Sequence, residues 1–303
     1  MKKLRHRIIE ILTRVLNVVK FIIGMLEFLF IVVIEDIFEV EGVKYSIIDE
    51  RERTVRVGTG VYDFSQPNAV SISFTSNLTI PNFVIYQHKL YRVIECGTCA
   101  FAYCDGLKSL VIGYSVEVVR NFSFFRCHNI GYVLFEVYSR LKTIEANAFY
   151  DNYASLSITF GGSMLEYIGA DAFGFNFRVQ IVRLPSSVKV IEPRTFRGFD
   201  SITLFEYCGT SEMNNEIFYR NMTGVFHMTP VNILIKVTSG YPSSLFGNET
   251  VTVDNNINCT FPTSLSNFEL HCETHYCINP YTGKISYLFS MIYAASDSNC
   301  SYI

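Results

Sequence analysis

Residues 187–199 read SVKVIEPRTFRGF, and the arrangement within them recurs along the middle of the chain. An aliphatic residue is followed four and five positions later by a small residue and Phe, here Ile191, Thr195 and Phe196. Copies recur every 23–25 residues. The five Phe residues are Phe101, Phe124, Phe149, Phe173 and Phe196, and their leading aliphatic residues are Ile94, Val119, Ile144, Ile168 and Ile191. A repeat of this length predicts a solenoid of stacked turns.

A short strand is predicted between successive anchors. Leu110 and Ile112, like Val182 and Leu184, alternate with outward positions, as in a strand with one buried face. One turn cannot bury its own apolar faces, so neighbouring turns must stack and share a core that contains each repeat Phe. The segment Leu78-x-Ile80-Pro81 predicts the strand of a preceding, degenerate copy.

The phrases at 187–199 and 165–173 (LEYIGADAF) resemble the BspA-type leucine-rich repeats of surface proteins in mucosal bacteria and protists. The opening VEGVKYSI at 40–47, with RTVRVG at 53–58, resembles the β-hairpin that often precedes such arrays. The resemblance implies a leucine-rich-repeat solenoid that binds protein or adheres to host surfaces or matrix. The chain departs from the family in its irregular repeat lengths.

Five regions are expected along the 303 residues. They are a signal peptide or signal-anchor helix over 1–38, an N-terminal β cap with the degenerate repeat over 39–90, five Phe-anchored turns of strands with irregular or short helical returns over 91–209, a post-repeat segment over 210–250 and a Cys- and Asn-rich region over 251–303.

The amino-terminal segment has the charge pattern of a targeting sequence. Basic residues at 2–7 precede an apolar stretch at 21–34, whose only charge is Glu27. This length suits a signal peptide and is short for a membrane span. No small-x-small cleavage site lies near its end, so the alternatives are an uncleaved anchor, a helix lying on a membrane or packed on the first repeat, and a start at Met25.

The chain has nine cysteines, seven of which fall into two groups. Cys96, Cys99 and Cys104 contain a Cys-x-x-Cys pair, but no second pair at zinc-finger spacing completes a metal site. The family resemblance places Cys104 and Cys127 as stacked, buried thiols, with a disulfide between them as the alternative. An even set near the carboxyl end predicts a disulfide-stapled region: Cys259, Cys272, Cys277 and Cys300.

Six Asn-x-Ser/Thr sequences are candidate N-glycosylation sites if the chain enters the secretory pathway. Their asparagines are Asn77, Asn121, Asn221, Asn248, Asn258 and Asn299.

The charge and the motifs narrow the function. A net charge of −3, with no dense basic cluster outside the first twenty residues, argues against nucleic acid. No nucleophile, phosphate-binding or metalloprotease motif is present, so we expect neither enzyme nor cofactor. The leading hypothesis is a cell-surface or secreted interaction protein whose ligand face holds Ser109, Val111, Leu134, Glu136, Thr159, Arg183 and Thr203. The alternatives are a membrane-associated intracellular scaffold and a diverged repeat copy without a ligand.

Overall fold

The computed structural model describes residues 37–71, 73–152, 154, 157–219, 233–260, 277–278 and 285–286. The chain divides into two units, 1–262 and 263–303. Within the second unit the described part is an antiparallel pair, β19 (Cys277–Ile278) and β20 (Ile285–Ser286). Residues 1–36 of the predicted signal or anchor segment lie outside the described residues. Among those described, no helix is long and apolar enough to cross a membrane.

The first unit begins with an antiparallel cap, as the hairpin-like opening predicts. β1 (Ile37–Val40), β2 (Val43–Asp49) and β3 (Thr54–Val57) pair antiparallel in order. β3 then pairs parallel with β6 (Lys89–Cys96), which also pairs with β5 (Phe83–Tyr86). β6 is therefore the point at which the cap becomes the solenoid, and it leads into the short parallel strands β8 (Val118–Val119), β10 (Thr143–Ile144), β12 (Tyr167–Ile168) and β14 (Val190–Ile191).

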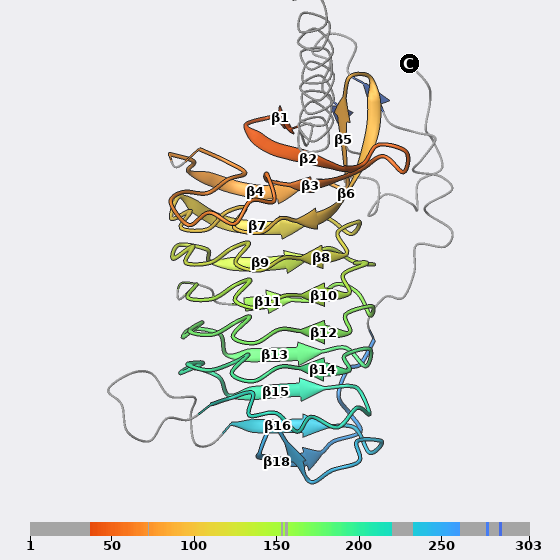
Figure 1. Ribbon diagram of the computed structural model, residues 1–303. Coiled ribbons are helices and arrows are strands. Elements are labelled where there is room, and N and C mark those ends of the chain that lie inside the picture. The colour runs from red at the N-terminus through yellow and green to blue at the C-terminus, as the bar shows by residue number, and fades with distance from the viewer. Residues whose placement is uncertain are drawn as a thin grey trace, which may run out of the picture. The chain divides into compact units, whose positions relative to one another are not determined.

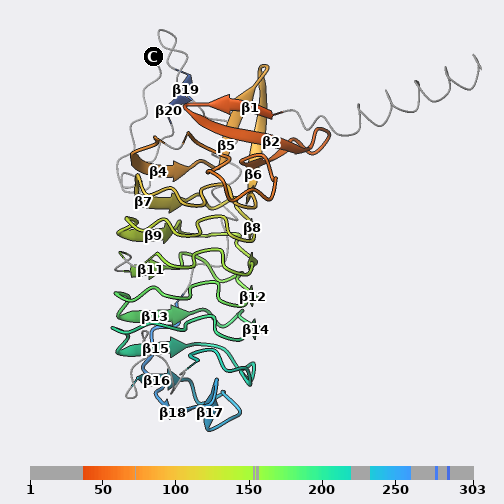
Figure 2. The ribbon, with the colours of Figure 1, turned by 60° about the vertical axis from the view of Figure 1, so that its left-hand side comes forward.

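A second line of parallel strands runs beside the first (Figures 1 and 2). One sheet contains β4 (Ser76–Ile80), β7 (Leu107–Ile112), β9 (Tyr132–Phe135) and β11 (Ser157–Thr159). The next contains β13 (Ile181–Leu184), β15 (Leu204–Tyr207), β16 (Leu234–Val237) and β18 (Glu249–Val253), with β17 (Leu245–Phe246) antiparallel to β18. From β7 to β14 each turn of the coil thus supplies one longer strand and one short strand.

The five predicted Phe anchors form one continuous stack. All five rings are fully buried or nearly so, and successive ring centroids lie 5.1, 5.1, 5.3 and 5.7 Å apart. The planes are nearly parallel, with angles of 6° or less. Centroid spacings in this range favour attractive offset stacking. Four of the leading aliphatic residues are also buried, at 1 % exposure or less: Val119, Ile144, Ile168 and Ile191.

The small residue before each Phe packs against the preceding turn. All five of these residues are fully buried. Two carry hydroxyls that donate hydrogen bonds to carbonyls of the turn before: Ser123 Oγ to Gly97 O at 2.7 Å, and Thr195 Oγ1 to Gly169 O at 3.0 Å. In these five turns the position therefore holds a small side chain, and a hydroxyl there links adjacent turns.

The parallel stack continues beyond residue 209, where the sequence pattern marks the last turn. Phe218 is buried, and its ring centroid lies 6.2 Å from that of Phe196. The main-chain nitrogen of Phe196 donates to the carbonyl of Ile217 at 2.9 Å. Met213 takes the place of the leading aliphatic residue and is likewise buried. Ile217 replaces the small residue, which hides this turn from the repeat pattern.

Candidate interaction face

The outward side chains of the longer strands form rows because the parallel strands are in register. Val111 of β7 lies beside Leu134 of β9, and the backbone of Leu134 is in register with that of Thr159 of β11. Further along, Ile181 lies beside Leu204, which lies beside Leu234. Residues that are far apart in the chain therefore lie next to one another on the surface of each sheet.

Several of these outward residues are large and apolar. The exposed fractions are 45 % for Tyr132, 36 % for Leu134, 51 % for Ile181 and 42 % for Leu234. Val111 is half-buried beside Leu134. We call these five residues the apolar face. Single exposed apolar side chains are ordinary, whereas apolar side chains that recur on one face of successive strands are typical of an interaction surface.

Two residues that the sequence places on the ligand face are buried instead. Ser109 is 5 % exposed. Where β4 advances by one residue, β7 advances by two, from Leu107 to Ser109. This extra residue shifts the alternation of inward and outward side chains, so Ser109 points inward. Glu136 is 8 % exposed, and its carboxylate turns into the bend. There it accepts hydrogen bonds from Asn82 Nδ2 at 3.3 Å and from the main-chain nitrogen of Tyr114 at 3.1 Å. Burial raises the pKa of Glu136.

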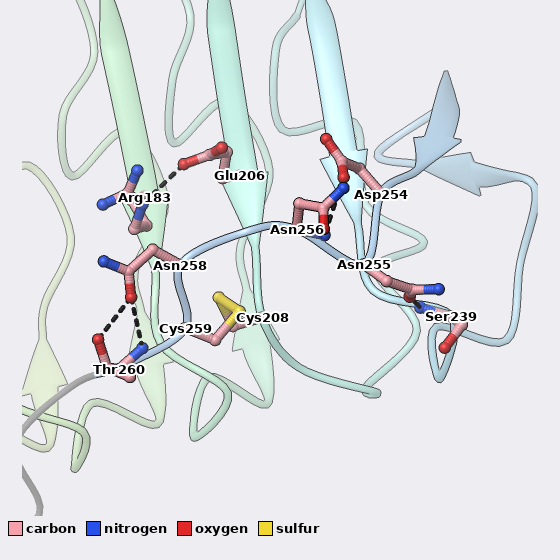
Figure 3. Close-up of a disulfide and its surroundings, with 10 residues drawn as sticks. All are labelled: Arg183, Glu206, Cys208, Ser239, Asp254, Asn255, Asn256, Asn258, Cys259 and Thr260. Atoms are coloured by element: carbon pink, nitrogen blue, oxygen red, sulfur yellow. Dashed lines mark hydrogen bonds and ion pairs between the residues drawn. A yellow bond between two sulfur atoms is a disulfide. The ribbon is translucent and has the colours of Figure 1, made fainter.

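Three further residues predicted for the ligand face are Arg183, Thr203 and Thr159. Arg183 Nε pairs with Glu206 at 2.7 Å, so its charge is engaged within the chain (Figure 3). Thr203 is exposed and donates from Oγ1 to the carbonyl of Gln180 at 3.2 Å. Thr159 lies on β11 in register with Leu134. The prediction took outward positions that lie between two inward ones, so it missed Tyr132 and Ile181, which precede the first inward residue of their strands, and Leu234, which lies beyond residue 209.

One disulfide corrects the predicted carboxyl-terminal set. Cys259 is bonded to Cys208, the residue that follows β15, and not to another cysteine of that set. After β18 the chain turns back across the neighbouring strands, which brings Cys259 beside Cys208 (Figure 3). We call residues 254–260 the strap. The predicted partners Cys272 and Cys300 lie outside the described residues, and of Cys277 only the backbone is described.

The cysteines of the repeats are free and buried, and for Cys104 and Cys127 this is what the resemblance predicts. These are Cys96, Cys99, Cys104 and Cys127. Burial raises the pKa of Cys127 well above its usual value and that of Cys104 to about 11. The Cys127 thiol donates to the carbonyl of Phe101 at 2.9 Å.

Asparagine replaces cysteine in the next two turns, where its side chain bonds the backbone of the bend. Asn152 accepts from the Cys127 nitrogen at 2.7 Å and donates to the carbonyl of Phe124 at 2.9 Å. Asn176 donates to the carbonyl of Phe149 at 2.9 Å. The cysteines at this position therefore serve the packing of the turns.

The other sheet has two rows of charges whose sign changes at each rung. The first row lies two positions before the leading aliphatic residues and comprises Arg92, Glu117, Lys142, Glu166 and Lys189. In this row Glu117 pairs with Arg92 at 3.1 Å and with Lys142 at 2.8 Å. Partial burial opposes ionisation of Glu117, but Lys142 and Arg92 outweigh it and lower its pKa.

The second charge row comprises Arg56, Glu95, Arg120 and Glu145. Arg120 bonds both Glu95 and Glu145, the latter at 2.8 Å. Neighbouring charges on this sheet therefore satisfy one another, in contrast to the apolar face on the longer strands.

A row of aromatic side chains lies along the returns, and the sequence analysis missed it. Tyr103, Phe125, Tyr150 and Phe175 follow one another at centroid distances of 5.5, 5.3 and 5.2 Å. Arg197 lies over the Tyr150 and Phe175 rings at 5.5 and 4.7 Å. These rings largely cover one another, and three of the four are half-buried. The recurrence of an aromatic residue one or two positions after each repeat Phe would have revealed the row.

The candidate glycosylation sites within the described residues differ in exposure. Asn77, Asn248 and Asn258 are exposed, whereas Asn121 is half-buried. Asn221 and Asn299 lie outside those residues. Among the side chains that the structure describes, no group of three or more His, Cys, Asp or Glu residues is arranged to hold a metal ion.

Several solved structures resemble the chain, whereas no curated protein matches it. A leucine-rich repeat protein from Bacteroides ovatus is 26 % identical, covers 60 % of this chain and 44 % of its own, and gives a TM-score of 0.47. The pneumococcal vaccine antigen PcpA is 21 % identical, with 68 % and 51 % coverage and a TM-score of 0.46. A leucine-rich cell surface protein from Faecalibacterium prausnitzii is 16 % identical, with 73 % and 55 % coverage and a TM-score of 0.43. The chain thus spans about half the length of these proteins.

Residues 94–223 match the BspA type leucine rich repeat region in six copies. The six copies agree with a sixth turn built on Met213 and Phe218, beyond the five that the Phe spacing marks. The repeat array of this chain therefore belongs to the BspA-type leucine-rich repeats.

Proposed function

We propose that the chain is a non-enzymatic surface or secreted protein that adheres to a protein ligand through the apolar face. The observation that carries this proposal is the exposure of large apolar side chains on several of the longer strands: Tyr132 and Leu134 on β9, Ile181 on β13 and Leu234 on β16. Burying such side chains against a partner releases about 25 cal/mol for each Å² of apolar surface removed from water.

The surface location rests on separate support. The Cys208–Cys259 disulfide fits an oxidising compartment, since such bonds are rare in cytosolic proteins. One similar structure is described as a cell surface protein. The basic and apolar amino-terminal sequence fits a signal peptide or signal anchor that directs the remainder outward.

The test is adhesion of cells that express the full chain. Non-adherent cells that display an epitope-tagged chain are applied to wells coated with purified extracellular-matrix proteins, and bound cells are counted. The double variant Tyr132→Ser/Leu134→Ser should reduce adhesion about tenfold or more, because central apolar contacts dominate binding energy. Val190→Ser is the matched control, since Val190 is 39 % exposed on the short-strand side.

Three results would contradict the proposal. Intact cells that leave the tag unreachable by antibody would favour the intracellular scaffold. Equal display without adhesion of the unmodified chain to any well would favour a diverged array without a ligand. Adhesion that the double variant retains in full would move the binding site away from the apolar face.

A further inference from the structure

Four of the six Asn-x-Ser/Thr sequences lie in the described residues, and three of them present both required side chains to solvent. Asn77 and Thr79 are exposed on the same face of β4. Asn248 and Thr250 are exposed at the hairpin of β17 and β18, where Asn248 has a φ of 70°. A surface position of this kind is what transfer of a bulky oligosaccharide requires.

The third exposed sequence belongs to the strap. Asn258 and Thr260 are both exposed. The Asn258 Oδ1 atom accepts hydrogen bonds from the main-chain nitrogen and the hydroxyl of Thr260, at 3.1 and 2.5 Å (Figure 3). The hydroxyl and the side-chain amide therefore already lie together.

The fourth sequence, Asn121 to Ser123, is part of a repeat turn and differs in its surroundings. Ser123 is the small residue before the repeat Phe, and it is fully buried. Its hydroxyl donates to carbonyls of Cys96, Gly97 and Arg120. The main-chain nitrogen of Asn121 bonds Glu145 at 3.0 Å. The repeat geometry alone explains why a small hydroxyl residue stands at 123, and the folded turn buries this hydroxyl away from solvent.

We propose that Asn77, Asn248 and Asn258 carry N-linked oligosaccharides, that Asn121 does not, and that the glycans on Asn77 and Asn248 shield the two ends of the strand stack. The inference rests on the secretory route in the proposed function. In the transfer, the amide nitrogen Nδ2 forms a bond to C1 of a lipid-linked oligosaccharide. The bond from C1 to the pyrophosphate breaks, and the lipid pyrophosphate leaves as Nδ2 loses one proton.

The ends of the stack need such a shield. β4 is the outermost strand of its sheet, and the β17–β18 hairpin ends the other. Outermost strands offer backbone groups to which another chain can pair. The terminal hairpin also exposes Leu245 by 45 % and Val253 by 57 %. A hydrated glycan on Asn77 or Asn248 would keep a second copy from stacking on the corresponding end.

The experiment uses the full chain made in eukaryotic cells. Peptide N-glycosidase F in heavy-oxygen water marks each asparagine that carried a glycan, and peptide mass spectrometry locates the mark. We expect marks at Asn77, Asn248 and Asn258 and an unmarked Asn121. The double variant Thr79→Ala/Thr250→Ala removes both end glycans and should sediment as larger species. Thr260→Ala is the control that removes a glycan from the strap and should sediment like the unmodified chain.

The mass spectrometry tests the assignment of the glycan sites, and the sedimentation tests their shielding role. An unmarked Asn77 or Asn248 on protein that has reached the cell surface would overturn the assignment of the sites, as would a marked Asn121. Marked sites combined with unchanged sedimentation of the double variant would overturn the shielding role. Asn77→Gln/Asn248→Gln repeats the measurement in case the threonine variants misfold. Adhesion is read separately, so loss of adhesion with marked sites contradicts only the proposed ligand face.

Discussion

Cys208 and Cys259 lie 51 residues apart in the sequence, yet their Cα atoms are 5.6 Å apart and their sulfurs are bonded. The bond fastens the strap to the residue after β15, and the strap follows the terminal strand β18. Backbone and side-chain bonds also hold the strap, since Asp254 bonds the carbonyl of Val237 at 2.9 Å and Lys236 Nζ at 2.8 Å. In a stack of turns that contact only their neighbours, this covalent link spans several rungs.

Loss of this bond should loosen the carboxyl-terminal end of the array first. A disulfide that closes a loop of this length stabilises a protein by about 2–4 kcal/mol. In Cys208→Ala/Cys259→Ala we expect faster hydrogen exchange at the amides of β16 and β18, with little change at β8 and β10. The unmodified chain, compared with and without a mild reductant, is the control. Uniform acceleration across all turns would contradict a local role for the bond.

The Phe stack predicts a large effect from a single ring. Phe149 lies between Phe124 and Phe173 at 5.1 and 5.3 Å, and it is almost fully buried. Phe149→Ala should destabilise the array by about 3–5 kcal/mol, because it removes contacts on both sides and leaves a cavity. Urea denaturation followed by circular dichroism measures the loss. Tyr132→Ala, which truncates an exposed ring, should change the midpoint little; equal effects of the two variants would count against the stack as the core.

The alternating charges predict an unusual result for a charge swap. Arg120→Glu places three carboxylates together and should cost about 1–3 kcal/mol, less at high salt, because salt screens such charges. Exchanging one isolated pair, Glu95→Arg/Arg120→Glu, normally restores stability. Here the swap sets residue 95 against Arg56 and residue 120 against Glu145, so we expect little recovery in the thermal unfolding midpoint.

Extending the swap supplies the control for the charge rows. The quadruple variant Arg56→Glu/Glu95→Arg/Arg120→Glu/Glu145→Arg inverts every sign in the second row and keeps the alternation. It should recover most of the stability lost in the double variant. If the double variant is as stable as the unmodified chain, the pairs are independent of one another and the row has no collective effect.

The burial of Glu136 predicts that replacing it with Gln stabilises the fold in a pH-dependent way. Because burial raises the pKa of Glu136 above its usual 4.5, the folded state favours its protonated form. Its contribution to stability is therefore present at low pH and is lost as the pH rises through the raised pKa. Glu136→Gln keeps the carboxyl shape without the charge, so its Tm should exceed that of the unmodified chain by about 1–2 °C at neutral pH.

The gain from Glu136→Gln should disappear below about pH 4, where both side chains are uncharged. Differential scanning calorimetry at the two pH values measures it. Glu166→Gln is the comparison, because Glu166 is exposed and pairs with Lys189. A neutral-pH loss in Glu136→Gln would mean that the ionised carboxylate is the form that Asn82 and Tyr114 stabilise.

Periodicity made most of the fold predictable. The spacing of Phe101 to Phe196 indicated stacked turns, and in the structure those rings form a single column. Leu78 and Ile80 were recognised as a degenerate strand, and they lie in register with Leu110 and Ile112. The buried Phe and aliphatic positions recur because every turn must fill the same interior volume, so each copy shows the same pattern in the sequence.

Features that depend on two distant positions were less predictable. Cys259 gave no sign of its partner because Cys208 belongs to a repeat strand and the strap's return path is not periodic. Ser109 and Glu136 failed as ligand-face residues because one extra residue in β7 and one bend carboxylate break the simple alternation. The charge rows were present in the sequence at a fixed offset, but only the parallel register shows that their members touch.

The alternating charges also constrain how such an array can change its length in evolution. Deleting or duplicating one turn within the first charge row would bring residues of like sign into adjacent rungs. Changing the array by two turns would preserve every opposite neighbour. The unit that can be gained or lost without an electrostatic penalty is thus twice the unit that the Phe spacing defines, and arrays descended from this one should differ by even numbers of turns.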